Sequence, residues 1–169
     1  SVALGMRTPA AGAPLSASKL SVHPIMRYTP GARAVVAAGP RVLKLLDLHD
    51  DMRAALGDYK ARFPRGLVVL RVYTRQQFAM SDDPAASAAE YWRAVLAPAE
   101  RRLIAFVEGP NEGDSTPTWT SVETATWFAR FWRVLAEKIG RAGFRPCLGS
   151  IPVGNPPGSP QEIEAKIAA

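Results

Sequence analysis

The residues with the clearest chemical potential are Asn111 and Glu112, which follow the turn Glu108-Gly109-Pro110. The apolar run before that turn, Leu103–Val107, predicts a buried strand. A strand that ends in a tight turn places the next polar residues at the mouth of a sheet, where they can meet a ligand. A glutamate there can exchange a proton with a bound molecule, and an asparagine can hydrogen-bond to it.

The run VEGPNEGD around these two residues resembles the acid/base motif after the fourth strand of the (β/α)8 retaining glycoside hydrolases, in the form found in cellulase-like and xylosidase-like members. The resemblance implies that Glu112 protonates the leaving oxygen and then acts as the base for water. It also implies that Asn111 donates to the 2-hydroxyl of the sugar, and that no cofactor is needed. By topology the resemblance extends over about Lys19 to Gly158, although only Asn111-Glu112 and its neighbours are specific.

Retaining glycoside hydrolysis needs a second carboxyl group about 5–5.5 Å from the first. One of the two must be protonated at the working pH, so its pKa must be raised by burial or by the charge of the other. In this clan the nucleophile is a glutamate at the end of strand seven, and the sequence offers no seventh strand. The resemblance therefore implies the N-terminal part of such a barrel.

The elements that must position these residues alternate between strands and helices. Apolar runs predict strands at Lys19–Ile25, Arg41–Asp47, Leu67–Tyr73, Leu103–Val107 and Phe144–Ser150. Capping and stop signals predict five helices. The first is an abbreviated helix within Tyr28–Pro40, the second runs from about Asp50 to Arg62 with Asp50 or Asp51 as its cap, and the third starts at Asp83-Pro84 and ends before Pro98. The fourth has a capping box at Thr120 and Glu123 and ends at Gly140 or Gly143, and the fifth has a capping box at Ser159 and Glu162.

This alternation predicts an α/β fold with a parallel sheet. Two architectures fit: a (β/α)8 TIM barrel represented by its first five β/α units, and an open doubly wound sheet. Complete barrels have about 250 residues, so the length favours the open sheet. However, Lys44 and Arg71 lie within predicted strands, and a barrel interior supplies the counter-charges that they need, with Glu108 and Asp47 available. We therefore expect the first five units of a barrel, with strands in sequential order.

Polar and aromatic residues follow the predicted strands, and in a parallel β/α protein they point to the same rim as Glu112. The expected carbohydrate-binding residues are His23, Asp47, His49, Tyr73, Arg75, Glu108, Trp119 and Asn155. Some have structural alternatives: a salt bridge to Lys44 or Arg71 for Glu108, and packing on the next helix for Trp119. The acids and the histidine between Asp47 and Asp51 lack a metal-ligand spacing, so no metal site is predicted.

The composition, 47% hydrophobic and 21% charged in 169 residues, is typical of a globular domain. We expect one β/α domain over residues 19–169 behind a loose leader, residues 1–18. No apolar run predicts a membrane span, and the leader lacks a signal-peptide pattern, which leaves the compartment open, secretion included. The net charge is +6, but the basic residues are scattered, which favours solvated helix faces over nucleic-acid binding. The only cysteine, Cys147, is interpreted as a core residue.

Three functions stay open at this point. The first is a retaining glycoside hydrolase domain, or its N-terminal part, with a β-linked carbohydrate as substrate. The second is a non-catalytic carbohydrate-binding or scaffold relative of such a barrel. The third is an open-sheet α/β enzyme with an unrelated site at the same strand ends. A half-barrel leaves strand edges unpaired, so we also expect either a homo-oligomer or a missing C-terminal half of the barrel.

Overall fold

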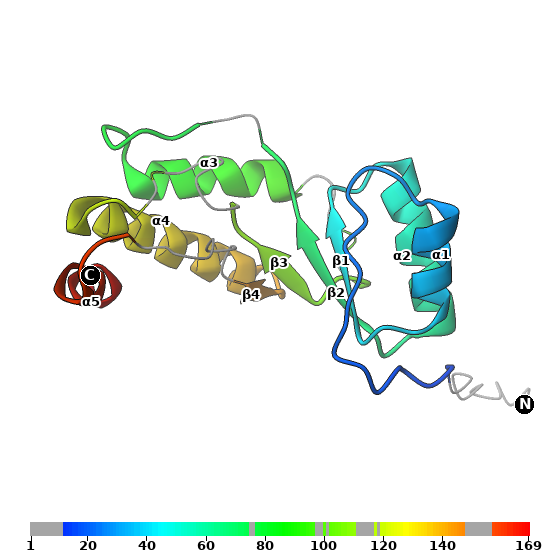
Figure 1. Ribbon diagram of the computed structural model, residues 1–169. Helices are drawn as coiled ribbons and strands as arrows, with labels where there is room; N and C mark the ends of the chain where they lie inside the picture. The colour runs from blue at the N-terminus through cyan, green and yellow to red at the C-terminus, as the bar shows by residue number, and fades with distance from the viewer. Residues whose placement is uncertain are drawn as a thin grey trace, which may run out of the picture.

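The computed structural model describes residues 12–74, 77–96, 100, 102–110, 117, 119–147 and 157–169. Helices and strands alternate along them: α1 (Pro30–Ala37), β1 (Val42–Leu46), α2 (Asp50–Arg62), β2 (Leu67–Arg71), α3 (Pro84–Leu96), β3 (Phe106–Glu108), α4 (Val122–Arg141), β4 (Arg145–Cys147) and α5 (Pro160–Ala168) (Figure 1). The four strands pair in parallel in the order β1-β2-β3-β4. The chain therefore has an α/β fold, and the sequential strand order is confirmed.

The predicted first strand, Lys19–Ile25, is reduced to one bridge between Val22 and Leu43. The N–H of Lys44 donates to the carbonyl of Val22 at 3.1 Å. Pro24 follows two residues later and has no N–H, so a ladder cannot continue through it. The segment still runs parallel beside β1, which is the neighbour that sequential order assigns to it.

The predicted strand Leu103–Val107 lies further along the chain than expected, at Phe106–Glu108. Pairing already begins at Ala105, whose N–H donates to Val68 and whose carbonyl accepts from Arg145, both at 3.0 Å. Glu108 is thus a strand residue rather than part of the following turn. The last three residues of the predicted strand Phe144–Ser150 lie outside the described residues.

The capping box of α4 lies one residue after the predicted one. Ser121, not Thr120, is the N-cap, and its hydroxyl accepts from the N–H of Thr124 at 3.1 Å. The Thr124 hydroxyl in turn accepts from the N–H of Ser121 at 3.0 Å. A threonine thus makes the reciprocal contact that the sequence pattern assigned to Glu123.

The cap of α2 also differs from the prediction. His49 precedes the helix and makes no side-chain cap bond, while Asp50 and Asp51 lie in the first turn, where the helix dipole favours carboxylates. The Asp51 carboxylate instead accepts from the N–H of Tyr28 at 2.9 Å. Other predicted signals are confirmed: Asp83 before α3, Ser159 with Glu162 at α5, and Gly143 with φ of 88° after α4.

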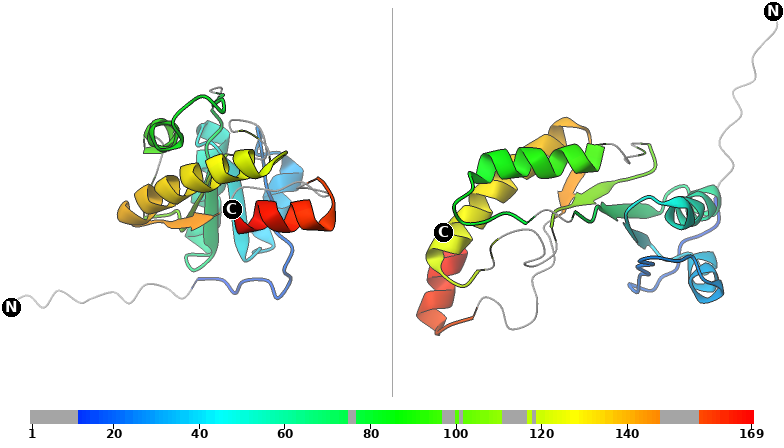
Figure 2. Two further views of the ribbon diagram at one scale, coloured as in Figure 1. Left: turned by 90° about the vertical axis from the view of Figure 1, so that its left-hand side faces the viewer. Right: turned by 90° about the horizontal axis from the view of Figure 1, so that it is seen from above.

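One face of the sheet is covered by helices. Right-handed crossovers between neighbouring parallel strands place each connecting helix on the same side. The residues of β1, β2 and β3 on that side are fully buried in one core with side chains of α2, α3 and α4: Leu43, Leu45, Val68, Leu70 and Val107. Seen from above, α1 to α4 form an arc along the outside of the strands (Figure 2). None of the described helices is long and apolar enough to cross a membrane.

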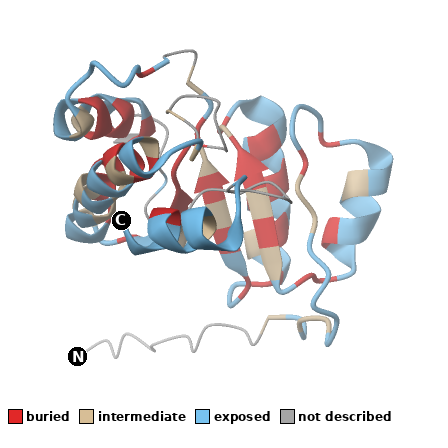
Figure 3. Ribbon diagram, turned by 60° about the vertical axis from the view of Figure 1, so that its left-hand side comes forward, coloured by how far each residue is buried: buried red, intermediate tan, exposed pale blue. Residues whose placement is uncertain are grey.

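The opposite side of the sheet, called the polar face below, carries the alternate strand residues. It is formed by Val42, Lys44, Leu46, Leu67, Val69, Arg71, Phe106, Glu108, Arg145 and Cys147. Most of these residues are only half-buried, so buried and half-buried residues alternate along the strands (Figure 3). A sheet with one apolar and one charged face places its chemistry on the charged one.

Candidate functional site

The polar face ends, at the carboxyl edge of the sheet, in a row of side chains that comes from all four strands. The strand register aligns Leu46, Arg71, Glu108 and Cys147 in this row. The bridge at Val22 places His23 beside Lys44, which lies in the row before. Ligands of parallel α/β sheets bind outside this edge, so the end of the polar face is the candidate site.

Lys44 and Glu108 form an ion pair across the polar face, with 2.5 Å between Nζ and Oε2. Because the lysine belongs to β1 and the glutamate to β3, the lysine side chain crosses over β2. The Glu108 side chain is 3% exposed and that of Lys44 is 24% exposed. The predicted salt bridge is therefore confirmed for this pair. A carboxylate as buried as this one needs such a partner, because desolvation otherwise outweighs every gain from burial.

His23 contributes a buried ring nitrogen to the site. Its Nε2 atom is inaccessible to water and has no hydrogen-bond partner among the described residues. Burial lowers the pKa of His23 below the ordinary value of 6.5, and the charges of Lys44 and Arg71 lower it further, while Glu108 opposes the shift. The ring is consequently neutral at pH 7 and keeps one unused hydrogen-bonding position.

Asp47 directly follows β1 and has a left-handed backbone, with φ of 61°. Its N–H donates to the carbonyl of Arg71 at 2.8 Å, and its Oδ1 accepts from the N–H of Tyr73 at 2.8 Å. Aspartate tolerates this conformation better than most residues, since its short side chain can bond to nearby backbone. Asp47 therefore fixes the loop after β1 to the end of β2.

Three further predicted binding residues are found near the ends of the elements. Tyr73 follows β2 and is 55% exposed, as a ring that stacks on a ligand must be. His49 is exposed immediately before α2. Trp119 is half-buried and packs edge-to-face on Phe128 of α4, with 5.4 Å between ring centroids, which is the contact that its structural alternative predicted.

Asn111 and Glu112, the predicted catalytic pair, lie outside the described residues, as do Arg75 and Asn155. These four residues stay predictions from the sequence.

The chain that leads to Asn111 is described as far as Pro110, which is buried. The N–H of Gly109 donates to the carbonyl of Cys147 at 3.3 Å. A Cβ atom on Gly109 would lie 2.1 Å from Cζ3 of Trp132, so only glycine fits between β3 and α4 here. The turn is thus held against β4 and α4 immediately before the predicted catalytic pair.

Sequence reasoning placed Cys147 in the core, whereas its register partner is Glu108 on the polar face. Burial raises the pKa of this thiol, and the charge of Glu108 raises it further against the effect of Lys44, so the thiol is neutral at pH 7. Strand alternation with Arg145 was visible in the sequence. The register that sets Cys147 beside Glu108 was not, because it depends on which strands become neighbours.

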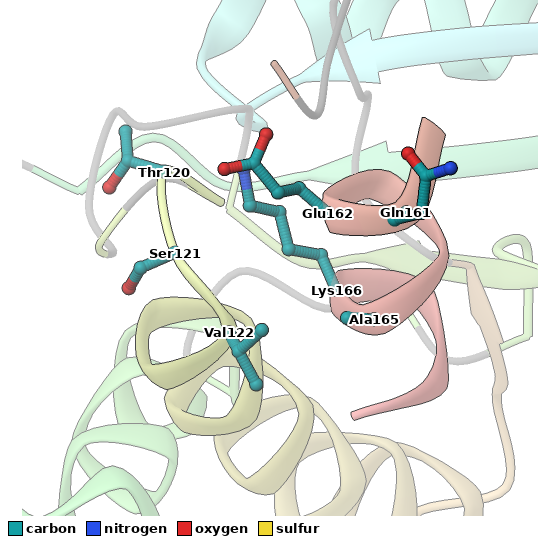
Figure 4. A pocket seen from close by; sticks show the side chains of 7 residues that line it. All are labelled: Thr120, Ser121, Val122, Gln161, Glu162, Ala165 and Lys166. Atoms are coloured by element: carbon teal, nitrogen blue, oxygen red, sulfur yellow. The ribbon is translucent and has the colours of Figure 1, made fainter. Parts of the chain in front are cut away.

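A hollow lies between α4 and α5 and is lined in part by Ser121, Glu162 and Lys166 (Figure 4). The Glu162 carboxylate accepts from the N–H of Ser159 at 2.7 Å, and Lys166 donates to the carbonyl of Pro157. These contacts cap and anchor α5, so they explain the charged side chains without a ligand. Among the described residues, no group of three or more His, Cys, Asp or Glu is placed to hold a metal ion.

A scan against protein-family models gave no match, and searches of curated proteins and of solved structures gave none either. The class defined by the fold and the site is therefore an α/β protein with a sequentially ordered parallel sheet and a charged cluster at its carboxyl edge.

Proposed function

We propose that this chain forms the N-terminal part of a (β/α)8 glycoside hydrolase that cleaves β-linked sugars with retention, with Glu112 as general acid and base. The observation that carries the proposal is the ion-paired Glu108 at the end of β3, which holds the strand end directly before Asn111-Glu112.

The strand order supports the barrel part of the proposal. A doubly wound sheet reverses its strand order so that helices cover both faces, whereas a barrel needs each crossover on the same side. The described strands follow the barrel order, and their polar face carries Lys44, Arg71 and Glu108. Charged side chains in such layers are compatible with a barrel interior, where neighbouring strands supply partners.

In the proposed reaction, protonated Glu112 gives its proton to the glycosidic oxygen while a second carboxylate attacks the anomeric carbon. The bond to the leaving group breaks and a glycosyl ester forms. Ionised Glu112 then takes a proton from water, the water oxygen attacks the same carbon, and the ester carboxylate leaves. Because Lys44 neutralises Glu108, the charge that raises the pKa of Glu112 must come from the second carboxylate, contributed by a later strand.

Non-catalytic carbohydrate binding is the second candidate, and the contacts of the described carboxylates favour it for this chain by itself. Glu108 is paired with Lys44, and Asp47 accepts from the backbone of Tyr73. Neither of these two described carboxylates is therefore available as a nucleophile. The exposed ring of Tyr73 is equally suited to binding without catalysis.

Glu112→Gln tests the catalytic proposal, in the protein together with the segment that completes its site. Turnover of glycosides with poor leaving groups should fall most, because activated leaving groups need little protonation. Azide should partly restore turnover of an activated aryl glycoside, since a small anion replaces the base-activated water. Asn111→Ala should lower turnover without this dependence on the leaving group, because its proposed role is hydrogen bonding. Unchanged hydrolysis of an unactivated glycoside by Glu112→Gln would exclude Glu112 as the acid.

A further inference from the structure

The charges on the polar face do not balance. Among the described residues of its four strands, three cationic side chains project from it, those of Lys44, Arg71 and Arg145, against the carboxylate of Glu108. That carboxylate is already paired with Lys44 at 2.5 Å. Arg145 is exposed at the start of β4, so the excess positive charge at the carboxyl end of the sheet comes from the half-buried Arg71. Charge interactions in such a setting are stronger than in open water.

Arg71 is the cation at the carboxyl edge itself. It lies in the end row between Leu46 and Glu108, and its side chain is only half-buried. Within the described residues its guanidinium forms no ion pair. Asp47, the counter-charge expected from the sequence, instead directs Oδ1 to the N–H of Tyr73. The backbone of Arg71 is nevertheless fixed, because its carbonyl accepts from the N–H of Asp47 at 2.8 Å.

His23 adds a second unused polar group to the same place. Its Nε2 atom is buried without a hydrogen-bond partner in the described part of the chain. Buried polar atoms are normally hydrogen-bonded, because an unpaired one costs about 1–3 kcal/mol. The charges of Lys44, Arg71 and Glu108 all act on this ring, so it lies within electrostatic reach of all three. The guanidinium of Arg71, on a fixed backbone near this neutral ring, suits one anionic group.

We propose that the end of the polar face binds the carboxylate of an acidic sugar, so that the carbohydrate recognised by this chain contains a uronic acid. This inference rests on the proposed carbohydrate function and adds the substrate class. A guanidinium binds a carboxylate through two parallel hydrogen bonds. The net charge of +6 favours the approach of an acidic glycan. A single half-buried arginine within a sheet suits one small anionic group rather than the phosphate track of a nucleic acid, which needs a continuous basic stripe.

The test compares two matched disaccharides, cellobiose and cellobiouronic acid, which differ by a carboxylate in place of a hydroxymethyl group. Calorimetry on the 169-residue chain should show at least about tenfold tighter binding of the acidic disaccharide, since about 1.4 kcal/mol corresponds to a factor of ten. Arg71→Gln should bring the two affinities within about twofold of each other, because it removes the guanidinium that distinguishes the carboxylate from the hydroxymethyl group. Arg133→Gln, on the exposed surface of α4, should leave the preference intact.

Equal affinities in the unaltered chain, a preference that survives Arg71→Gln, or binding of neither sugar would each overturn the inference. Free glucuronate serves as the third ligand: binding as tight as that of cellobiouronic acid would mean that a free anion, not a sugar chain, is recognised. Hydrolysis of neutral and acidic glycosides at equal rates would leave the proposed function standing and reject the acidic substrate. An Arg71-dependent preference for the acidic sugar without hydrolysis would support the acidic ligand and reject the proposed hydrolase activity.

Discussion

Glu108 is the residue on which the site depends most, because it is a carboxylate buried at the end of a strand. Glu108→Gln should lower the free energy of unfolding by about 3 kcal/mol, since it leaves the Lys44 ammonium without its counter-charge in a partly desolvated place. Urea unfolding followed by tryptophan fluorescence would measure this loss.

The same substitution in an exposed pair provides the control. Glu137 pairs with Arg141 at 3.5 Å on the surface of α4, with 56% and 81% of the two side chains exposed. Glu137→Gln should cost less than about 0.5 kcal/mol, because water and salt screen such pairs. Similar losses for both variants would show that the Lys44–Glu108 pair contributes no more than a surface pair.

His23 should titrate at a lower pH than an ordinary histidine, because burial and nearby positive charges lower its pKa. Its pKa in the folded chain is lowered by burial first and by Lys44 and Arg71 next, so its ring signals should move at a pH below 6.5. Proton NMR can follow this, and His49→Asn identifies the signals because the chain has only two histidines. Arg71→Gln should raise the midpoint, since it removes a nearby positive charge.

The shift of His23 also links folding to pH. The unfolded chain protonates His23 near pH 6.5, whereas the folded chain resists protonation until a lower pH. Between these two values the unfolded state binds more protons, so stability must fall as the pH drops below about 6.5 and level off below the folded pKa. Loss of this acid-side slope in His23→Gln would be the expected signature, and an unchanged slope would assign it to other groups.

At the scale of elements, the contact between the end of β3 and α4 determines where the predicted catalytic pair begins. Gly109→Ala places a methyl group 2.1 Å from the Trp132 ring, so either the ring or the turn must move. Such overpacking should lower stability by about 1–3 kcal/mol. Gly57→Ala on α2 is the matched control: nothing lies within 4 Å of its Cβ position, and alanine should raise stability by about 0.5–1 kcal/mol.

Equal effects of the two alanine substitutions on the thermal midpoint would mean that Trp132 yields without cost. A functional assay separates movement of the Trp132 ring from movement of the turn. If the turn moves instead of the ring, Gly109→Ala should lower activity more than its effect on stability explains, because Asn111 follows two residues later.

The sequence predicted the elements well where local signals were strong, and less well where tertiary contacts decided. Helix α2 was expected from about Asp50 to Arg62 and has those bounds, because its stop signal is a proline-glycine turn. The run Lys19–Ile25 has strand composition, yet Pro24 limits it to one bridge at Val22. Thr120 and Ser121 are both good caps, and the pattern alone could not choose between them.

The candidate site was predictable in its charges but not in its backbone contacts. Strand alternation placed Lys44 and Arg71 on one face and Glu108 at the rim, which is why the ion pair could be expected. The left-handed backbone of Asp47 could not be read from its residue type, so its bond to Tyr73 was missed. Asp47 thus bonds to the backbone of Tyr73, and among the described residues the Arg71 guanidinium forms no ion pair.

For the whole molecule, the two faces of the sheet distinguish a barrel from a doubly wound sheet. In a barrel the helices cover one face only, whereas in a doubly wound sheet they cover both. All connecting helices lie on the apolar face because the strand order never reverses. Two neighbouring valines of β2 can test the difference between the faces. Val68 is fully buried under the helices, and Val69, on the polar face, is half-buried.

Val68→Ala should lower the free energy of unfolding of the 169-residue chain by about 2 kcal/mol, since it removes two buried methyl groups and leaves a cavity. Val69→Ala removes the same atoms from the polar face and should cost less than half as much. Chemical denaturation of the two variants, at several protein concentrations, measures both values. Equal losses that grow with protein concentration would show that a second copy covers the polar face. Equal losses that do not depend on concentration would show that the chain covers this face itself, and then no open cleft would stand above Arg71 and Glu108 for a sugar to enter.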